Sequence, residues 1–195
     1  MIPLWIKLAY TLMTVIIIVI YLRKYGPGNL LWFSDIALIV TVPALWLENN
    51  FLASMMAVGV LLPETLWNLS YFTRLLTGRR FLGITDYMFE PQRPTYLKIL
   101  SLFHVPLPLI LIWMLAKLGY VESAVIAQSL LILIVLPLSY WFTDPFKNVN
   151  WVRGMGGEGY AQTRFSPPVF LGILMIVPLF VVVLPTHFLL LYLFG

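Results

Sequence analysis

The sequence contains no cysteine among its 195 residues. This absence excludes disulfides, catalysis by a thiolate and metal sites built on cysteine ligands. Charged residues are also scarce, at 10% of the chain, and only two histidines are present. Soluble domains carry about 25% charged residues. The low charge therefore argues against an ordinary soluble domain.

The residues that are present form long apolar runs, and hydrophobic residues make up 61% of the chain. A helix needs about 20 mostly apolar residues to cross a bilayer core about 30 Å thick. Six such runs lie between clusters of charge, at residues 4–22, 29–47, 51–72, 97–116, 123–142 and 167–194. They are continuously apolar, unlike the alternating strands of about ten residues in a membrane β-barrel. We therefore predict one all-α integral membrane domain over residues 1–195, a polytopic transmembrane helix bundle with six crossings.

The last run is longer than one crossing requires. Proline cannot donate the backbone hydrogen bond of a helix interior, and it kinks or breaks the helix that contains it. We expect Pro178 or Pro185 to interrupt this run.

The basic residues are distributed asymmetrically, and this predicts the orientation. Lys and Arg near the ends of crossings are retained on the cytoplasmic side. Ten of the twelve basic residues fall in the loops after the first, third and fifth runs: Arg23, Lys24, Arg74, Arg79, Arg80, Arg93, Lys98, Lys147, Arg153 and Arg164. We therefore predict that these loops face the cytoplasm and that both termini lie outside.

Two of these loops have compositions that suggest more than a connection. The cytoplasmic loop 73–96 mixes arginines with aromatic residues, which suits a segment in the headgroup layer that attracts anionic lipid. The loop 143–166 contains glycines and carries Asp144, Asn148 and Asn150 near its start. We expect these three to bind substrate at the mouth of a cavity, although Asp-Pro and Asn are also ordinary formers of solvated turns. No signature of nucleic-acid binding is present.

Three runs each contain an ionisable side chain at a similar depth. A helical rise of about 1.5 Å per residue places Asp35, Glu64 and His104 about 9, 12 and 10 Å from their cytoplasmic ends. Asn68 shares the helix face of Glu64, and Ser101 shares the face of His104. A lone carboxylate near the bilayer centre costs about 2.5 to 3.5 kcal/mol. We expect Asp35, Glu64 and His104 to meet around a cavity that opens to the cytoplasm.

This polar layer has two interpretations. In the first, His104 is a general acid or base, Asp35 or Glu64 orients it, and Asn68 with Ser101 holds the substrate. In the second, the same residues form a static hydrogen-bonded network that fixes helix packing. Two carboxylates and a histidine also suit iron or zinc, but no ligand spacing supports a metal site. No metal or other cofactor is assigned.

Four stretches carry a resemblance to known proteins: YGPGNLLWFSDIAL (residues 25–38), LASMMAVGVLLPETLWNL (52–69), SLFHVPLP (101–108) and THFLL (186–190). Together they resemble a set of uncharacterised bacterial six-helix membrane proteins with no established activity. The resemblance implies a multi-pass protein of the bacterial inner membrane, and it assigns no site residue.

Three classes of function fit the sequence. An enzyme acting on a lipid or other amphiphile needs polarity on one side of the membrane only, as the polar layer supplies. A non-catalytic subunit would use the layer to bind a partner membrane protein or a second copy of the chain. A small-solute transporter needs polar lining on both sides of a midplane site, and the outer half offers only Gln128, His187 and scattered threonines.

Overall fold

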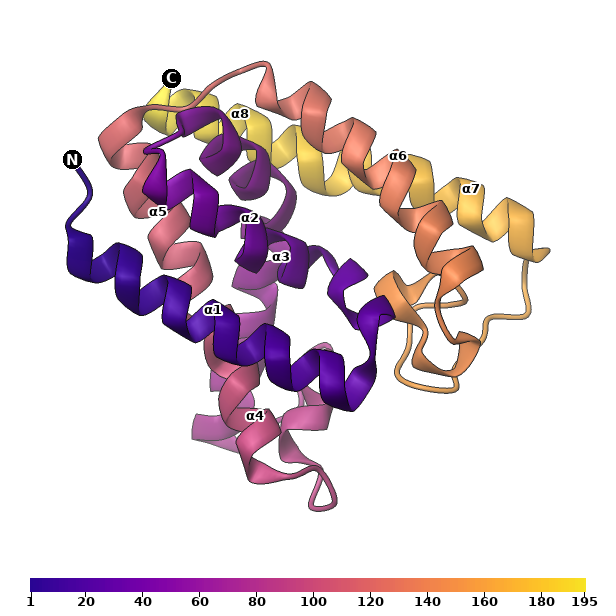
Figure 1. Ribbon diagram of the computed structural model, residues 1–195. Coiled ribbons are helices and arrows are strands. Elements are labelled where there is room, and N and C mark those ends of the chain that lie inside the picture. Colours follow the sequence, from indigo (N-terminus) through magenta and orange to yellow (C-terminus); the bar gives the residue numbers. More distant parts are fainter.

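The computed structural model describes residues 1–195 and contains helices but no strands, which confirms the all-α prediction. Figure 1 shows the longer helices, which are α1 (Leu4–Tyr25), α2 (Phe33–Trp46), α3 (Asn50–Thr77), α4 (Thr95–Ser101), α5 (Pro106–Leu118), α6 (Ala124–Phe142), α7 (Pro167–Pro178) and α8 (Leu184–Phe194). Short 3-10 turns lie at η1 (Pro27–Leu31), η2 (Asp86–Phe89), η3 (Leu102–His104), η4 (Pro145–Lys147) and η5 (Val149–Trp151). A π-helical turn, η6 (Leu179–Val183), joins α7 to α8.

Five helical segments are long and apolar enough to cross a membrane: Leu4–Tyr25, Asn50–Thr77, Thr95–Leu118, Ala124–Phe142 and Pro167–Phe194. The helix α2 has only 14 residues, so it spans about 21 Å at 1.5 Å per residue. This is shorter than a bilayer core of about 30 Å, because η1 occupies the first part of the predicted run. The sixth crossing and the outside position of the termini stay predictions.

The last segment is interrupted where the prolines predict. The π-helical turn η6 follows Pro178 directly and ends one residue before α8, whose second residue is Pro185. A proline removes one backbone N–H and crowds the preceding turn. The wider π turn accommodates that disturbance between the two prolines.

The helix α3 forms the centre of the bundle. It packs against α2, α5, α6 and α8. In its most apolar 18-residue stretch 50% of the residues are buried, whereas the corresponding share in α1 is 22%. Small residues line its buried face and permit close approach, as in other membrane bundles. At Gly59, a Cβ atom would lie 2.2 Å from Nε2 of Gln128. Glycine at this position therefore lets α6 lie close to α3.

Both chain termini lie at one end of the bundle, which we call the terminal end (Figure 1). The Ile2 amide donates to Glu48 Oε1 at 2.9 Å, which joins the N-terminus to the turn between α2 and α3. The Tyr120 amide donates to the Phe194 carbonyl at 3.0 Å, which joins the turn between α5 and α6 to the C-terminus. Asn50 links the two turns by donating to the Leu118 carbonyl at 3.3 Å.

The three basic loops meet at the opposite end, which we call the basic end. Lys147 of the third loop donates to the Tyr25 carbonyl at the end of α1. Arg93 of the second loop donates to the Tyr25 hydroxyl at 3.1 Å. Asn150 donates to the Leu31 carbonyl at 2.7 Å. These contacts join the three basic loops to one another at this end of the molecule, and the orientation itself stays a prediction.

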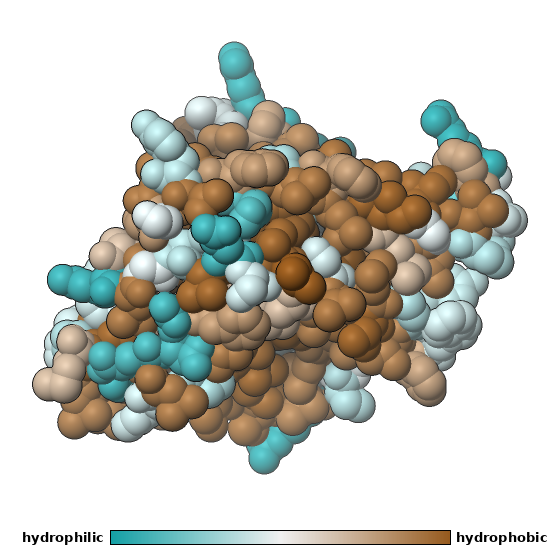
Figure 2. Space-filling model, turned by 90° about the horizontal axis from the view of Figure 1, so that it is seen from above, coloured by the Kyte–Doolittle hydropathy of each residue, from teal (hydrophilic) through white to brown (hydrophobic).

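The outer faces of the helices are apolar. Figure 2 shows a surface on which hydrophobic residues prevail and hydrophilic residues form small, separate patches. On α1 the exposed side chains include Leu4, Leu8, Leu12 and Val15. Surfaces on which apolar side chains prevail in this way are rare on monomeric soluble proteins. They match a helical bundle whose outer faces contact lipid.

The orientation is tested by reporter fusions. We expect reporters inserted at Gly78 and Gly156 to report a cytoplasmic position, and reporters at both termini to report an external one, because basic loops are retained inside. The measurement is the paired activity of a cytoplasm-specific and an exterior-specific reporter at each site. A C-terminus found in the cytoplasm would contradict the orientation.

The terminal end generates a prediction about pH. The pKa of Glu48 is lowered by its hydrogen bonds with Lys7 and with the Ile2 amide, and by the positive charge of Lys7. A lowered pKa means that ionised Glu48 stabilises the fold above its unfolded value of about 4.3, and that this contribution is lost as the pH falls. Between about pH 6 and pH 3 the Tm of the wild type should therefore fall further than that of Glu48→Gln. Glu122→Gln, at the same end and without an ion pair, is the control that should behave as the wild type does.

Candidate functional site

The structure brings Glu64 and His104 into direct contact. Glu64 lies on the central helix α3 and is 3% exposed. His104 ends the 3-10 turn η3, where the chain tightens before Pro106 begins α5. Proline lacks the N–H that would continue the preceding helix, so α4 and α5 meet at a break that carries the histidine. His104 Nδ1 lies 2.8 Å from Glu64 Oε2.

Two aromatic rings hold the imidazole between them. Trp67, one turn from Glu64 on α3, stacks on His104 with ring centroids 4.5 Å apart and planes at 21°. Phe103 stacks on the imidazole as well, with centroids 4.2 Å apart and planes at 25°. Rings packed in this way leave little freedom for the imidazole to rotate away from Glu64.

Asn68 fixes the backbone of the same pair. Its Nδ2 donates to the His104 carbonyl at 2.7 Å and to the Glu64 carbonyl at 2.8 Å. Pro108 lies four residues after His104 and has no N–H to offer that carbonyl. A carbonyl without a partner is costly inside a membrane. Asn68 therefore supplies the hydrogen bond that proline removes, and both N–H groups of its amide are used.

The outer atoms of the dyad are free. His104 Nε2 and Glu64 Oε1 make no hydrogen bond, and neither is among the fully buried side-chain atoms that lack a partner. Both atoms therefore keep a small accessible surface, consistent with a His104 side chain that is 13% exposed. The arrangement is an imidazole oriented by a carboxylate through Nδ1, with Nε2 open to a second molecule.

Asp35 lies apart from this pair in the hydrogen-bond network. Its Oδ2 accepts a hydrogen bond at 2.9 Å from Asn29 of η1, and no hydrogen bond joins it to Glu64 or His104. It occupies the first turn of α2, where the helix dipole favours a negative charge. Asn29 and the helix start thus supply the partners that the carboxylate needs in an apolar run.

Ser101 also has partners other than His104. Its Oγ donates to the Leu97 carbonyl at 3.0 Å and lies 3.1 Å from the Tyr21 hydroxyl of α1. The sequence spacing placed Ser101 on the face of His104, but the change from α-helix to 3-10 turn at Leu102 lies between them. Ser101 therefore joins α4 to α1.

The sequence reasoning missed Trp67 and Phe103 as neighbours of His104, and Tyr87 as the partner of Trp67. The Trp67 indole donates to the Tyr87 hydroxyl at 3.1 Å, which ties loop 73–96 to the ring that covers the imidazole. Burial raises the pKa of Tyr87, so this hydroxyl stays neutral. The position of Trp67, three residues after Glu64, was an available signal, because residues three apart share a helix face.

The three polar residues of loop 143–166 are engaged in local structure. Asp144 accepts a hydrogen bond from the Phe146 amide at 2.9 Å and caps η4. Asn148 donates to the Gly154 carbonyl at 2.8 Å and accepts from the Arg153 amide at 2.9 Å. Asp and Asn side chains commonly make such hydrogen bonds to nearby backbone groups in turns.

Asn150 joins three segments that lie far apart in the sequence. Its Nδ2 donates to the Leu31 carbonyl at 2.7 Å and to Ser139 Oγ at 2.9 Å. Its Oδ1 accepts from the Phe33 amide at 3.2 Å, the first N–H of α2. No side chain at the start of α2 caps that helix. Asn150 performs this role from a distant loop.

The second histidine belongs to the terminal end. His187 Nδ1 lies 2.7 Å from the Tyr120 hydroxyl, and burial raises the pKa of Tyr120 to about 12. A neutral tyrosine and an imidazole thus join α8 to the turn between α5 and α6. No group of three or more His, Asp or Glu side chains is placed to hold a metal ion.

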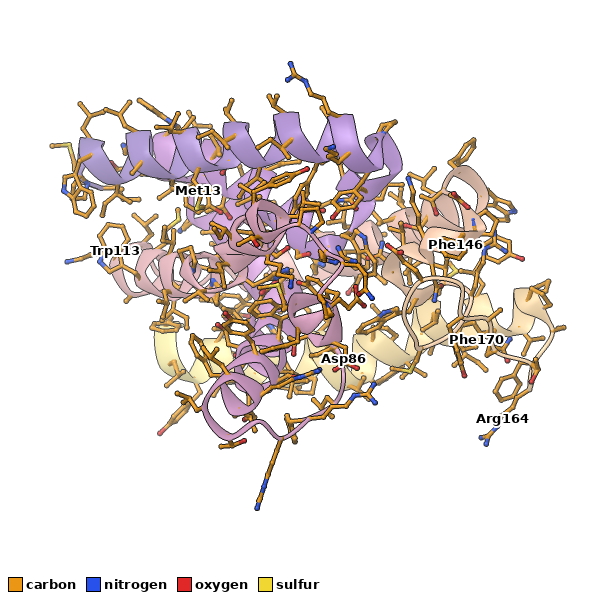
Figure 3. All side chains as sticks on the ribbon, turned by 90° about the horizontal axis from the view of Figure 1, so that it is seen from below. Met13, Asp86, Trp113, Phe146, Arg164 and Phe170 are labelled. Carbon is orange, nitrogen blue, oxygen red and sulfur yellow. The ribbon has the colours of Figure 1, made fainter.

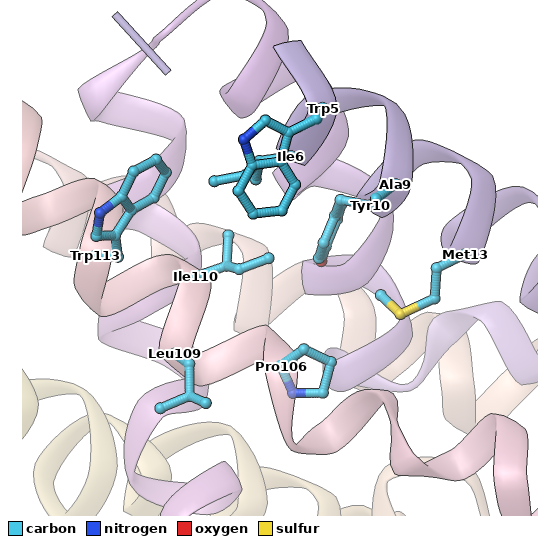
Figure 4. Close-up of a pocket in the computed structure, with 9 residues that line it drawn as sticks. All are labelled: Trp5, Ile6, Ala9, Tyr10, Met13, Pro106, Leu109, Ile110 and Trp113. Carbon is cyan, nitrogen blue, oxygen red and sulfur yellow. The ribbon is translucent and has the colours of Figure 1, made fainter. Parts of the chain in front are cut away.

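An apolar groove of about 420 Å³ runs between α1 and α5 (Figure 4). Figure 4 shows Trp5 and Met13 on α1 facing Trp113 and Pro106 on α5. The Tyr10 hydroxyl, a polar group in the groove lining, donates to the Leu38 carbonyl at 3.3 Å. The groove is therefore suited to a hydrocarbon chain. Its lining includes Pro106, which follows His104 by two residues in the sequence.

No family model matches the chain, and the searches of curated proteins and solved structures found no match. The five apolar helices define the class to which it belongs, a multi-pass α-helical membrane protein.

The geometry of Asn150 predicts a structural effect. Replacing Asn150 with Ala removes its buried hydrogen bond to Ser139 and its part-buried bonds with Leu31 and Phe33, and a buried polar group left unsatisfied costs about 1–3 kcal/mol. We expect a free energy of unfolding lower by that amount in equilibrium denaturation. Asn50→Ala, which removes an exposed hydrogen bond, should change it by less than about 0.5 kcal/mol. Equal effects of the two substitutions would contradict the capping role.

Proposed function

We propose that the protein is a membrane-embedded enzyme that acts on a lipid or other amphiphile by acid–base chemistry, with His104 as the catalytic base. The observation that carries the proposal is the Glu64–His104 contact, 2.8 Å through Nδ1. A carboxylate that holds one imidazole nitrogen leaves the other nitrogen directed and available, which is the usual geometry of a histidine base. The clamped ring and the accessible Nε2 support the same role.

The chemistry follows from this orientation. Nε2 takes a proton from a water molecule or a substrate hydroxyl as that oxygen bonds to the carbonyl carbon or phosphorus of a substrate ester, and the adjacent Glu64 carboxylate stabilises the resulting imidazolium. The bond from that centre to the leaving oxygen then breaks. The imidazolium then returns the proton to the departing group. The Ser101 hydroxyl is hydrogen-bonded to Tyr21 and to the Leu97 carbonyl, so it is not assigned as the nucleophile. The attacking oxygen in this scheme belongs to water or to the substrate.

The surroundings favour an amphiphile as the substrate. His104 lies within an apolar crossing segment, and the α1–α5 groove beside Pro106 is lined almost entirely by apolar residues. A molecule reaching Nε2 through lipid needs an apolar part to enter and a polar part to react. In the proposal Asp35 contributes to the polar layer from α2, and Asn68 holds the backbone in place.

The membrane setting is also part of the proposal. Ten basic residues at one end support a cytoplasmic position for that end and an attraction to anionic lipid. Six crossings, external termini and the bacterial inner membrane complete this setting. The resemblance noted in the sequence supports the last of these.

The proposal is tested by the products formed in a membrane. Protein reconstituted in liposomes of bacterial polar lipid should convert a lipid component, detected by mass spectrometry. His104→Gln keeps hydrogen bonding but cannot act as a base near neutral pH, and we expect the rate to fall by at least about 10²-fold. Glu64→Gln should also lower the rate, because a neutral amide stabilises imidazolium less well.

The matched control is His187→Gln, which alters the other histidine at the terminal end and should keep the wild-type rate. Folding is followed separately by thermal unfolding of each variant. His104→Gln with wild-type turnover would contradict the catalytic role. A wild type that leaves every lipid unchanged, while His104→Gln lowers Tm, would instead support a packing network.

A further inference from the structure

We propose a second site, distinct from the Glu64–His104 pair, that binds a phosphate group through Arg153 at the basic end. A pocket of about 90 Å³ lies there between α6, loop 143–166 and the start of α7. Its seven lining residues are Tyr140, Val152, Arg153, Ala161, Gln162, Pro167 and Phe170. Arg153 is the only charged residue in this lining.

The guanidinium of Arg153 is held in place. Its Nη2 donates to the Tyr140 carbonyl at 2.9 Å, and its Cζ lies 4.5 Å from the centre of the Tyr140 ring. These contacts use one of its five N–H donors. The remaining donors form a planar fork, which suits the two oxygens of a phosphate better than a flexible ammonium does.

No carboxylate neutralises this guanidinium. At the same end, Arg74 and Arg80 pair with Asp86, and Arg93 lies near Glu90 and Glu158. Arg153 makes no such pair. It is the arginine at this end that is fixed by its neighbours, lines a pocket and retains an uncompensated positive charge.

Other parts of the pocket determine which ligand it accepts. Gln162 Nε2 donates to the Phe165 carbonyl at 2.9 Å, which leaves the second N–H of that amide for a ligand. The helix α7 begins with Pro167 and Pro168, which have no N–H, so the start of this helix donates nothing in its first two positions. Arg153 must therefore carry the binding. The volume equals that of about three water molecules, which is enough for one tetrahedral oxyanion.

The loop is folded so as to form this pocket. The backbone N–H of Gln162 donates to the backbone carbonyl of Arg153 at 2.8 Å. At Gly154, a Cβ atom would lie 2.7 Å from the Gln162 nitrogen, so the close return of the chain requires glycine there. The loop thereby brings Arg153 and Gln162 to the same pocket from positions nine residues apart.

The position of the pocket explains why a phosphate would reach it. It lies where α6 ends and α7 begins, and the exposed aromatic residues Trp141, Phe142, Phe146 and Phe165 are within a few residues of these helix ends in the sequence. Exposed aromatic rings at the ends of crossings lie at the headgroup level of a bilayer. The phosphate of a lipid headgroup and free inorganic phosphate are the two sources of the same group.

The experiment measures Tm of the purified protein in neutral detergent. One arm adds inorganic phosphate at constant ionic strength. The second adds short-chain phosphatidic acid, with short-chain diacylglycerol as the comparison that lacks a phosphate. A ligand that binds the folded state raises Tm in a saturable manner. We expect such a rise with phosphatidic acid, with inorganic phosphate, or with both, and the effective arm identifies the source.

Three variants locate the site. Arg153→Gln should raise the half-saturating concentration by about tenfold or more, because charge-assisted hydrogen bonds are lost. Gln162→Glu keeps the acceptor for the Phe165 amide, places a negative charge in the pocket and should abolish the rise. The control is Arg164→Gln, which removes the same charge from a side chain that Figure 3 shows directed outward at the edge of the molecule.

Arg164→Gln should change the half-saturating concentration by less than about twofold. If Arg153→Gln unfolds, Gln162→Glu decides the outcome by itself. The proposal is overturned if neither ligand raises Tm in a saturable manner. It is equally overturned if Arg164→Gln weakens binding as much as the pocket variants do, since the effect would then reflect general charge.

Discussion

A buried carboxylate on an apolar helix requires a partner within the protein, and the contact of Glu64 with His104 supplies it across α3 and the α4–α5 segment. Charge in a medium of low dielectric is costly unless it is paired and hydrogen-bonded. This requirement places η3 beside α3, and the proline break in the α4–α5 segment turns His104 toward the carboxylate. Trp67 and Asn68 then complete the packing from the next turn of α3.

The same rule accounts for the other polar groups between the two ends. Asp35 is satisfied by Asn29 and the start of α2, and Ser101 by Tyr21 and its own helix. Three buried side-chain atoms have no partner, among them Gln128 Oε1 beside Gly59. Asp35 and Ser101 are thus satisfied in separate small clusters. The Glu64–His104 cluster differs from the Asp35 and Ser101 clusters because its histidine nitrogen remains accessible.

The basic end is an organised layer, formed by contacts between loops that are distant in the sequence. Asn150 caps α2 from the third loop, Lys147 reaches the end of α1, and Tyr87 of the second loop supports Trp67. The loops therefore influence both α2 and the rings around His104. A ligand held at Arg153 would act on the same layer, because Asn148, which shapes the turn before Arg153, belongs to the loop that carries Asn150.

The sequence by itself determined the helical class, five of the crossing segments, the gathering of basic residues at one end and the interruption near Pro178. Each of these follows from composition or from local backbone chemistry, which acts within a few residues. The pairing of Glu64 with His104 was within reach for a related reason, since depth along a helix follows from the number of residues. The length of α2, the separate partner of Asp35 and the turn of Ser101 toward α1 were decided by the tertiary structure. They depend on rotation about helix axes, on 3-10 turns and on partners such as Asn29 and Asn150, and depth alone contains no information about the direction in which a side chain points.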